Sequence, residues 1–159
     1  MKYPDDIDLF FILENHGWST CYIYVGGQMY QLAPTHVFEN PIEVFLDSLT
    51  AMLEGATDVA FKWHDEPGEY NWEITRNPVQ QHKVIVSITK CVQLTSGSSP
   101  KLETLNFEVK LKLFCICVLR QMEKIRDLMT EKSFKEHREG QFPYHSFERF
   151  HQAYVQAFS

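Results

Sequence analysis

The strongest constraint on the fold is a series of short segments in which apolar and polar residues alternate, the pattern of a half-buried β-strand. Three of these segments come first and four follow later, at residues 7–13, 18–25, 28–32, 59–63, 70–75, 83–92 and 105–109. In two of the turns between them, Gly26-Gly27 and Asn15-His16-Gly17, we expect Gly and Asn to take the positive φ of a tight hairpin. Strands joined by such short turns must be antiparallel neighbours.

Segments with helical periodicity lie between the two runs of strands and after the second run. Asn40-Pro41 predicts the start of a helix, because Asn is a good N-cap and Pro suits the first helical position. An apolar stripe continues to Leu53, and Gly55 is expected to end the helix. Further helices are expected later in the chain, at residues 111–131, 133–139 and 145–158.

This order of elements is typical of an α+β protein, because the helices follow runs of strands and do not alternate with single strands. We expect one twisted antiparallel sheet of about seven strands, with the helices packed on one face. The loosely composed loop Thr95–Pro100 is too short to separate domains, so residues 1–159 are predicted to form a single domain.

Composition indicates a soluble, folded protein of the cytoplasm. Hydrophobic residues make up 44% of the 159 residues, near the globular norm. The N-terminus lacks the pattern of a secretory signal, and no apolar run approaches the length of a membrane span, so no membrane partner is expected. The four cysteines are predicted to be reduced and to act as small hydrophobes, since Cys115 and Cys117 lack the spacing of a redox or zinc motif.

Charge is distributed unevenly along the chain. Residues 1–74 contain 13 acidic and two basic residues, a formal charge of −11, whereas residues 75–159 carry +5. Either the two parts neutralise each other in the fold, or an acidic face stays exposed and attracts a basic protein partner. Nucleic acid is not expected as a partner, because phosphate binding needs concentrated cations.

The most unusual segment is Trp63–Trp72, an acidic turn flanked by aromatic residues. It is predicted to be a hairpin tip that binds a protein partner, because Trp and Tyr beside charged groups resemble interface hot spots. The candidate residues in this tip are Trp63, Asp65, Glu66, Glu69 and Tyr70. The alternative interpretation is an ordinary acidic turn whose aromatic side chains anchor the strands.

The turn before the second strand is a candidate of similar type. His16 and Trp18 are predicted to join the partner-binding surface, because the two turns lie at one edge if the two meanders are adjacent. His16 is otherwise an ordinary solvated turn residue.

Recognised catalytic and cofactor motifs are missing from the sequence. We find no nucleotide-binding glycine loop, nucleophile elbow or His-Glu-x-x-His pattern, so no cofactor, catalytic residue or metal ligand is assigned. An enzyme is a second hypothesis, a small hydrolase or metal-dependent protein using His16, His64, Glu66 or Glu69. A third hypothesis is a self-associating structural protein that forms a homodimer.

Two resemblances accompany these observations. At His16-Gly17-Trp18 and at residues 65–72 (Asp-Glu-Pro-Gly-Glu-Tyr-Asn-Trp), the chain resembles a family of small uncharacterised bacterial α+β proteins. In size, charge and architecture it is also similar to the acidic immunity proteins of bacterial toxin systems. The first resemblance implies no activity, and the second implies a non-enzymatic protein that binds a basic partner.

Overall fold

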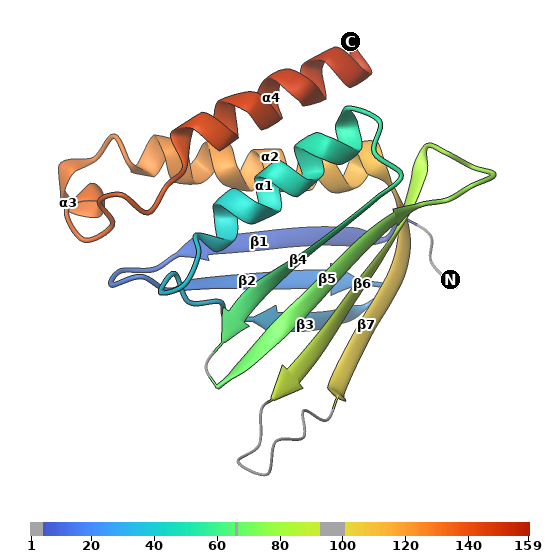
Figure 1. The fold of residues 1–159 in the computed structure, drawn as a ribbon. Coiled ribbons are helices and arrows are strands. Elements are labelled where there is room, and N and C mark those ends of the chain that lie inside the picture. Colours follow the sequence, from blue (N-terminus) through green and yellow to red (C-terminus); the bar gives the residue numbers. More distant parts are fainter. Residues whose placement is uncertain (1–4, 66, 93–100) are drawn as a thin grey trace.

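A computed structural model describes residues 5–65, 67–92 and 101–159 (Figure 1). The chain forms strands and helices in the predicted order of three strands, one helix, four strands and then helices. Their bounds are β1 (Ile7–Leu13), β2 (Ser19–Val25), β3 (Gln28–Leu32), α1 (Pro41–Leu53), β4 (Asp58–Asp65), β5 (Gly68–Arg76), β6 (Lys83–Val92), β7 (Lys101–Lys110), α2 (Leu111–Leu128), α3 (Lys132–Lys135) and α4 (Tyr144–Phe158). The expected loop Thr95–Pro100 lies outside the described residues.

The predicted α+β class is confirmed, but the strands form two sheets instead of one. One sheet has the order β1-β2-β3 and the other has the order β4-β5-β6-β7, with antiparallel pairing throughout. Short turns dictate pairing within each run, whereas α1 separates β3 from β4 and removes that constraint. The expectation of a single continuous sheet is therefore corrected.

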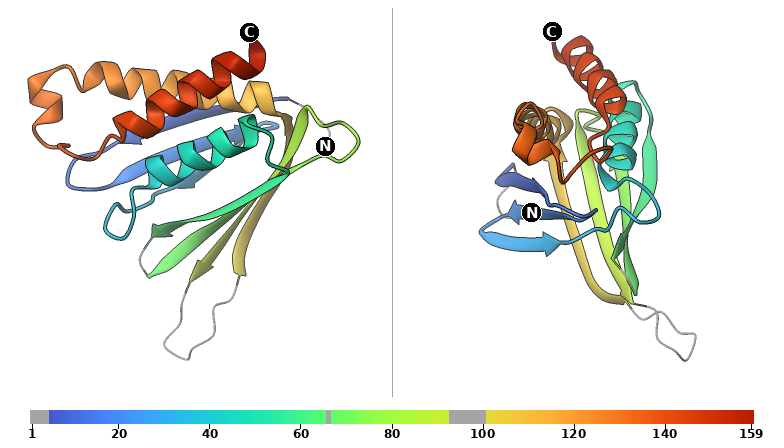
Figure 2. Two further views of the ribbon diagram at one scale, coloured as in Figure 1. Left: turned by 45° about the horizontal axis from the view of Figure 1, so that its top comes forward. Right: turned by 90° about the vertical axis from the view of Figure 1, so that its left-hand side faces the viewer.

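Helices α1, α2 and α4 lie together on one side of the two sheets (Figures 1 and 2). Helix α1 packs against β4 and α4, and α2 packs along β1. The inner faces of the sheets meet in the core, where the ring of Phe11 on β1 lies edge-on to Trp63 on β4, with 6.1 Å between centroids. Each sheet therefore has one inner face and one outer face.

The centre of the core is a cluster of aromatic rings around Phe45 of α1. Its ring centroid lies 5.3 Å from Trp63, 5.1 Å from Trp72 and 6.2 Å from Phe114 of α2. Trp63 also donates a 2.9 Å hydrogen bond to the carbonyl of Pro41, so the indole is anchored at both its apolar and its polar side. One cluster thus joins α1, α2 and the four-stranded sheet.

Helix α1 begins as its sequence predicts. The Asn40 side chain accepts hydrogen bonds from the amides of Ile42 and Glu43, and Pro41 occupies the first helical position. At the other end, Gly55 takes a φ of 108°, which ends the helix. Positive φ at the β1–β2 turn falls on His16 (59°) and Gly17 (81°) and not on Asn15, which corrects the expected turn residue.

The edge of β1 is covered by polar side chains from the C-terminal part of the chain. The amide of Phe11 donates to Gln121 Oε1 at 3.1 Å, and the Phe11 carbonyl accepts from Lys124 Nζ at 2.7 Å. Arg138 Nε donates to the carbonyl of Leu13 at 2.6 Å. These contacts satisfy edge groups that would otherwise be open to another strand.

The later helices differ slightly from their predicted limits. Helix α2 ends at Leu128 and not at residue 131, and the short helix expected over residues 133–139 is a single turn, α3. Apolar periodicity marks the buried stripe but not the residue at which backbone hydrogen bonding stops. Among the described residues, no helix has the length and apolar character needed to cross a membrane.

Candidate functional site

The predicted hairpin tip does not expose its aromatic residues. Trp63 retains 1% of its accessible surface and Tyr70 retains 4%, and the two are paired across β4 and β5. The alternation that makes these strands half-buried places both side chains on the inner face. Trp63 and Tyr70 are therefore core residues, and their predicted place on a partner-binding surface is corrected.

The carboxylates of the tip are partly neutralised. Asp65 accepts a 2.9 Å hydrogen bond from Tyr70 and lies 4.0 Å from Lys90, and Glu69 lies 3.5 Å from Lys62. Glu66 lies outside the described residues. Such pairs contribute little to stability at the surface, but they reduce the acidic field that would attract a basic partner.

The two predicted turns lie at the same end of the molecule, joined by the segment that follows β3. The amide of Thr35 donates to the carbonyl of His64 and the amide of His36 donates to the carbonyl of Gly17, each at 2.8 Å. Trp18 pairs with Thr35 as an isolated bridge and is 40% exposed. Residues 35 and 36 thus link the two turns, although the turns belong to two separate sheets and not to one edge of a single sheet.

The histidines at this end have separate surroundings. The ring of His16 lies 6.2 Å from that of His137, and the ring of His64 lies 5.0 Å from Phe38. His64 Nε2 is also 3.9 Å from the carboxylate of Glu39. Within residues 5–65, 67–92 and 101–159, no three His, Cys, Asp or Glu side chains are grouped so that they could hold a metal ion.

A different surface combines acidic and aromatic side chains: the outer face of the three-stranded sheet. Even-numbered residues of β1 point outward there, and register places Asp8 opposite Tyr24 and Phe10 opposite Tyr22. Met29 of β3 extends the first row beyond Tyr24. We call this surface the acidic-aromatic face and define it by Asp6, Asp8, Phe10, Tyr22, Tyr24 and Met29.

The acidic-aromatic face is hollowed into a groove of about 480 Å³, which its six residues line together with Ile7 and Leu9. Phe10 is 48% exposed and Met29 is 63% exposed, so the apolar part is open to solvent. The rings of Phe10 and Tyr22 stack with 6.3 Å between centroids. Exposed apolar groups beside a groove are a feature of interaction sites.

The two carboxylates of this face keep their charge uncompensated within the described part of the chain. Asp8 accepts a 2.8 Å hydrogen bond from the amide of Leu9, and Asp6 accepts a 3.4 Å hydrogen bond from the hydroxyl of Tyr24. Neither forms an ion pair with a described residue, whereas neighbouring Asp5 lies 3.5 Å from Lys110. The face therefore has a negative charge available to a ligand.

Lys124 lies against the Phe10 ring of the acidic-aromatic face and forms no ion pair with Asp6 or Asp8. Its ammonium lies 4.2 Å from the centroid of the Phe10 ring and donates to the Phe11 carbonyl and to Gln121. Burial lowers the pKa of Lys124 from its usual value. This contact shows that the Phe10 ring accepts a cation on one side.

The alternation of residues in the first two strands indicates this face. Asp8 alternates with the apolar residues of the first strand, so its side chain is expected on the face opposite to theirs. Tyr22 and Tyr24 are two residues apart in the second strand, so they share one face. The register between β1, β2 and β3 places these residues side by side on one surface. Register is a property of the folded sheet.

No protein-family model, curated protein or solved structure matches the chain. Carboxylates beside exposed aromatic rings attract positively charged groups, since the rings bind cations on their faces and the carboxylates add a longer-range attraction.

Proposed function

We propose that this protein is a non-enzymatic binding domain that recognises a basic protein partner through the acidic-aromatic face. The observation that carries the proposal is the position of Asp6 and Asp8. Both lack an ion-pair partner among the described residues, and both line a groove with Phe10, Tyr22 and Met29. We therefore propose the outer face of β1–β3 as the acidic partner-binding surface, in place of the hairpin tip that the sequence predicted.

The chemistry of the face favours arginine or lysine side chains in the partner. A guanidinium or ammonium group can stack on the rings of Tyr22 and Tyr24 and meet the carboxylates of Asp6 and Asp8 at the same time. Met29 adds a flexible apolar contact at the edge of the groove. The steering effect of the carboxylates increases the association rate more than it lowers the dissociation rate.

An immunity-like role is one specific form of this function. Its support is the acidic charge of residues 1–74 and the resemblance in size and architecture to immunity proteins, which block basic partners. We also propose that the protein acts in the cytoplasm.

The proposal is tested with a charge-neutralising double variant, D6N/D8N. The wild-type protein is immobilised and used to capture binding partners from an extract of the source cells, and each captured protein is then purified and its affinity measured by calorimetry. We expect a basic partner whose affinity falls at least tenfold in D6N/D8N. Raising the ionic strength from about 0.1 M to about 1 M shortens the Debye length from about 10 Å to about 3 Å and should weaken binding further.

The matched control is the double variant E131Q/E136Q, which changes the net charge by the same amount at two exposed residues of the α2–α3 region. It should bind the partner with wild-type affinity. Equal losses in both double variants would mean that net charge alone drives binding and would contradict the proposed face. A sedimentation coefficient that falls in D6N/D8N would instead identify a second copy of this chain as the occupant.

A further inference from the structure

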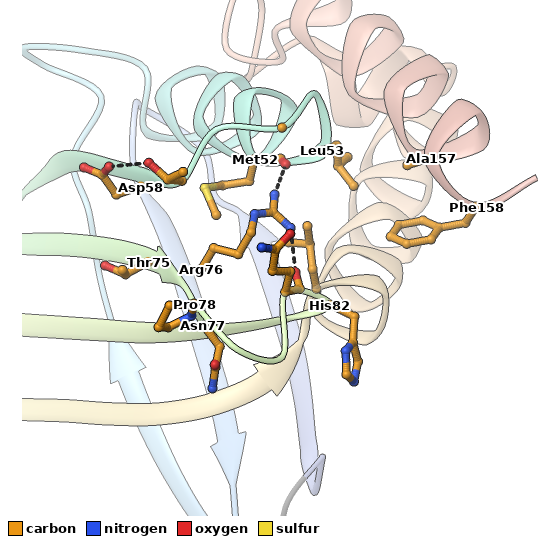
Figure 3. Close-up of a pocket in the computed structure, with 14 residues that line it drawn as sticks. Met52, Leu53, Asp58, Thr75, Arg76, Asn77, Pro78, His82, Ala157 and Phe158 are labelled. Carbon is orange, nitrogen blue, oxygen red and sulfur yellow. Dashed lines mark hydrogen bonds between the residues drawn. The ribbon is translucent and has the colours of Figure 1, made fainter.

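A second cavity lies on elements that take no part in the acidic-aromatic face. It has a volume of about 730 Å³ and opens between the C-terminal end of α1, the β5–β6 turn and the ends of α2 and α4 (Figure 3). Its size falls in the range of about 300 to 1,000 Å³ that is usual for small-molecule sites.

Arg76 occupies the middle of this cavity in a fixed position. Its guanidinium donates to three backbone carbonyls, those of Ala56 at 3.2 Å, Gln81 at 2.8 Å and Met52 at 2.5 Å. Figure 3 shows the bonds to Gln81 and Met52. Met52 belongs to the last turn of α1, Ala56 lies in the connection after that helix, and Gln81 lies in the β5–β6 turn. The charged group is therefore held in place before any ligand arrives.

The charge of Arg76 has no anionic partner within the described residues. All three of its acceptors are neutral carbonyl oxygens, and no carboxylate lies within ion-pair distance of the guanidinium in the described ranges. A guanidinium has five N–H donors, so two are left for a ligand. A half-buried cation of this kind favours an anion that can accept both.

The surrounding wall is apolar on one side and rigid on the other. Met52, Leu53, Leu111 and Phe158 line the cavity with hydrocarbon and an aromatic ring. On the opposite side, the Asn77 side chain accepts hydrogen bonds from the amides of the next turn, those of Val79 and Gln80, each at 2.9 Å, which fixes the β5–β6 turn.

We propose that this cavity binds a small monocarboxylate with a short hydrocarbon chain. The carboxylate accepts hydrogen bonds from the guanidinium of Arg76, and the hydrocarbon chain lies against Leu53, Leu111 and Phe158. Exposed His82 lines the cavity and adds a further donor.

A dianion such as inorganic phosphate fits this cavity less well. Arg76 is the one residue with a permanent positive charge among the described residues that line it, and Asp58 lines the same cavity with a negative charge. A monocarboxylate needs only one cation, and its chain gains from the apolar wall.

The test is titration of the isotope-labelled protein with hexanoate, followed by amide chemical shifts. Hexanamide serves as the ligand control, because it has the same chain length and no charge. We expect saturable shifts at Leu53, His82 and Phe158, with hexanamide binding at least tenfold more weakly. Shifts without saturation, shifts confined to other residues or equal binding of both compounds would overturn the proposal.

Two variants assign the effect to the cavity. R76Q removes the charge and should abolish the preference for hexanoate over hexanamide. Because R76Q also removes contacts to α1, a second variant, A157W, fills the open side of the cavity at an exposed position of α4. A157W should retain the wild-type melting temperature and lose at least tenfold in hexanoate affinity, and unchanged affinity in A157W would contradict the proposed location.

Discussion

His36 lies in the segment after β3, where its Nε2 is 2.6 Å from the hydroxyl of Ser19. Burial lowers the pKa of His36 from 6.5 to about 4. The unfolded chain therefore takes up a proton between pH 6.5 and pH 4 while the folded chain does not. Its contribution to the free energy of unfolding should be full above pH 6.5 and fall as the pH is lowered.

We predict that this histidine accounts for about 1 to 2 kcal/mol of the stability lost between pH 7 and pH 4, after allowance for its partial exposure. The variant H36Q removes the titration, so its unfolding free energy in urea should vary less with pH than that of the wild type. H145Q, at an exposed position, is the matched control and should keep the wild-type pH dependence. An H36Q curve parallel to the wild-type curve would contradict the assignment.

The four cysteines are free thiols in the fold, as their spacing predicts. Cys21 and Cys115 are fully buried, and desolvation raises the pKa of both thiols well above the usual value. Cys91 and Cys117 are half-buried. Reactivity with a thiol reagent should therefore divide into two classes.

We expect Cys91 and Cys117 to react with an aromatic disulfide reagent in the folded protein, while Cys21 and Cys115 react only at the rate of unfolding. The reaction is followed by absorbance in native buffer and again in urea. In the double variant C91S/C117S the fast phase should disappear and the slow phase should remain. A fast phase that persists in this variant would show that the buried thiols are accessible.

At the scale of elements, we predict that the contact between α2 and the edge of β1 stabilises the fold. Lys124 provides the hydrogen bond to the Phe11 carbonyl, so K124M keeps most of the apolar stem and leaves this acceptor unpaired. We expect a loss of about 1 to 3 kcal/mol in the free energy of unfolding, measured by urea denaturation. K132M changes an exposed lysine of α3 and should stay within about 0.5 kcal/mol of the wild type.

The edge of β1 shows why the limits of strands and helices were predictable from the sequence, whereas the contacts between distant elements were not. Alternation located each strand to within a few residues, and Asn40-Pro41 located the start of α1, because these signals depend on neighbours in sequence. The pairing of Phe11 with Gln121 joins residues 110 positions apart. No local pattern indicates such a pair, so the cover over β1 emerged only from the structure.

At the scale of the whole molecule, the two sheets are expected to unfold together. Phe11 on the first sheet contacts Trp63 on the second, and both are buried in the same core. The variant F11A should lower the free energy of unfolding by about 3 to 5 kcal/mol, because it removes a large ring and leaves a cavity. Loss of this contact should destabilise both sheets equally.

The measurement compares two probes of one urea transition. Fluorescence in a Trp18→Phe background reports on buried Trp63 and Trp72 of the second sheet, and pulsed alkylation of Cys21 reports on the first sheet. Coincident transitions in both the parent and F11A would support a single domain over residues 1–159. Separate midpoints would contradict it and would show two independently folding units.

The candidate sites also divide between sequence and structure. The sequence predicted an acidic, aromatic binding surface but assigned it to the β4–β5 turn, where Trp63 and Tyr70 are buried and Asp65 faces Lys90. The alternation of apolar and polar residues along β4 and β5 already places Trp63 and Tyr70 on the inner face, so their assignment to an exposed tip conflicted with the strand pattern. The cavity around Arg76 had no local signal at all, since its walls come from five separate elements.

The sequence by itself thus determined the α+β class, the order and approximate limits of the strands and helices, the start of α1 and the uneven charge. These properties follow from backbone preferences and apolar periodicity over a few residues. Tertiary structure decided the division into two sheets, the cover over β1, the acidic-aromatic face and the cavity at Arg76. Each of these depends on residues distant in sequence, whose proximity is set by packing of the common core.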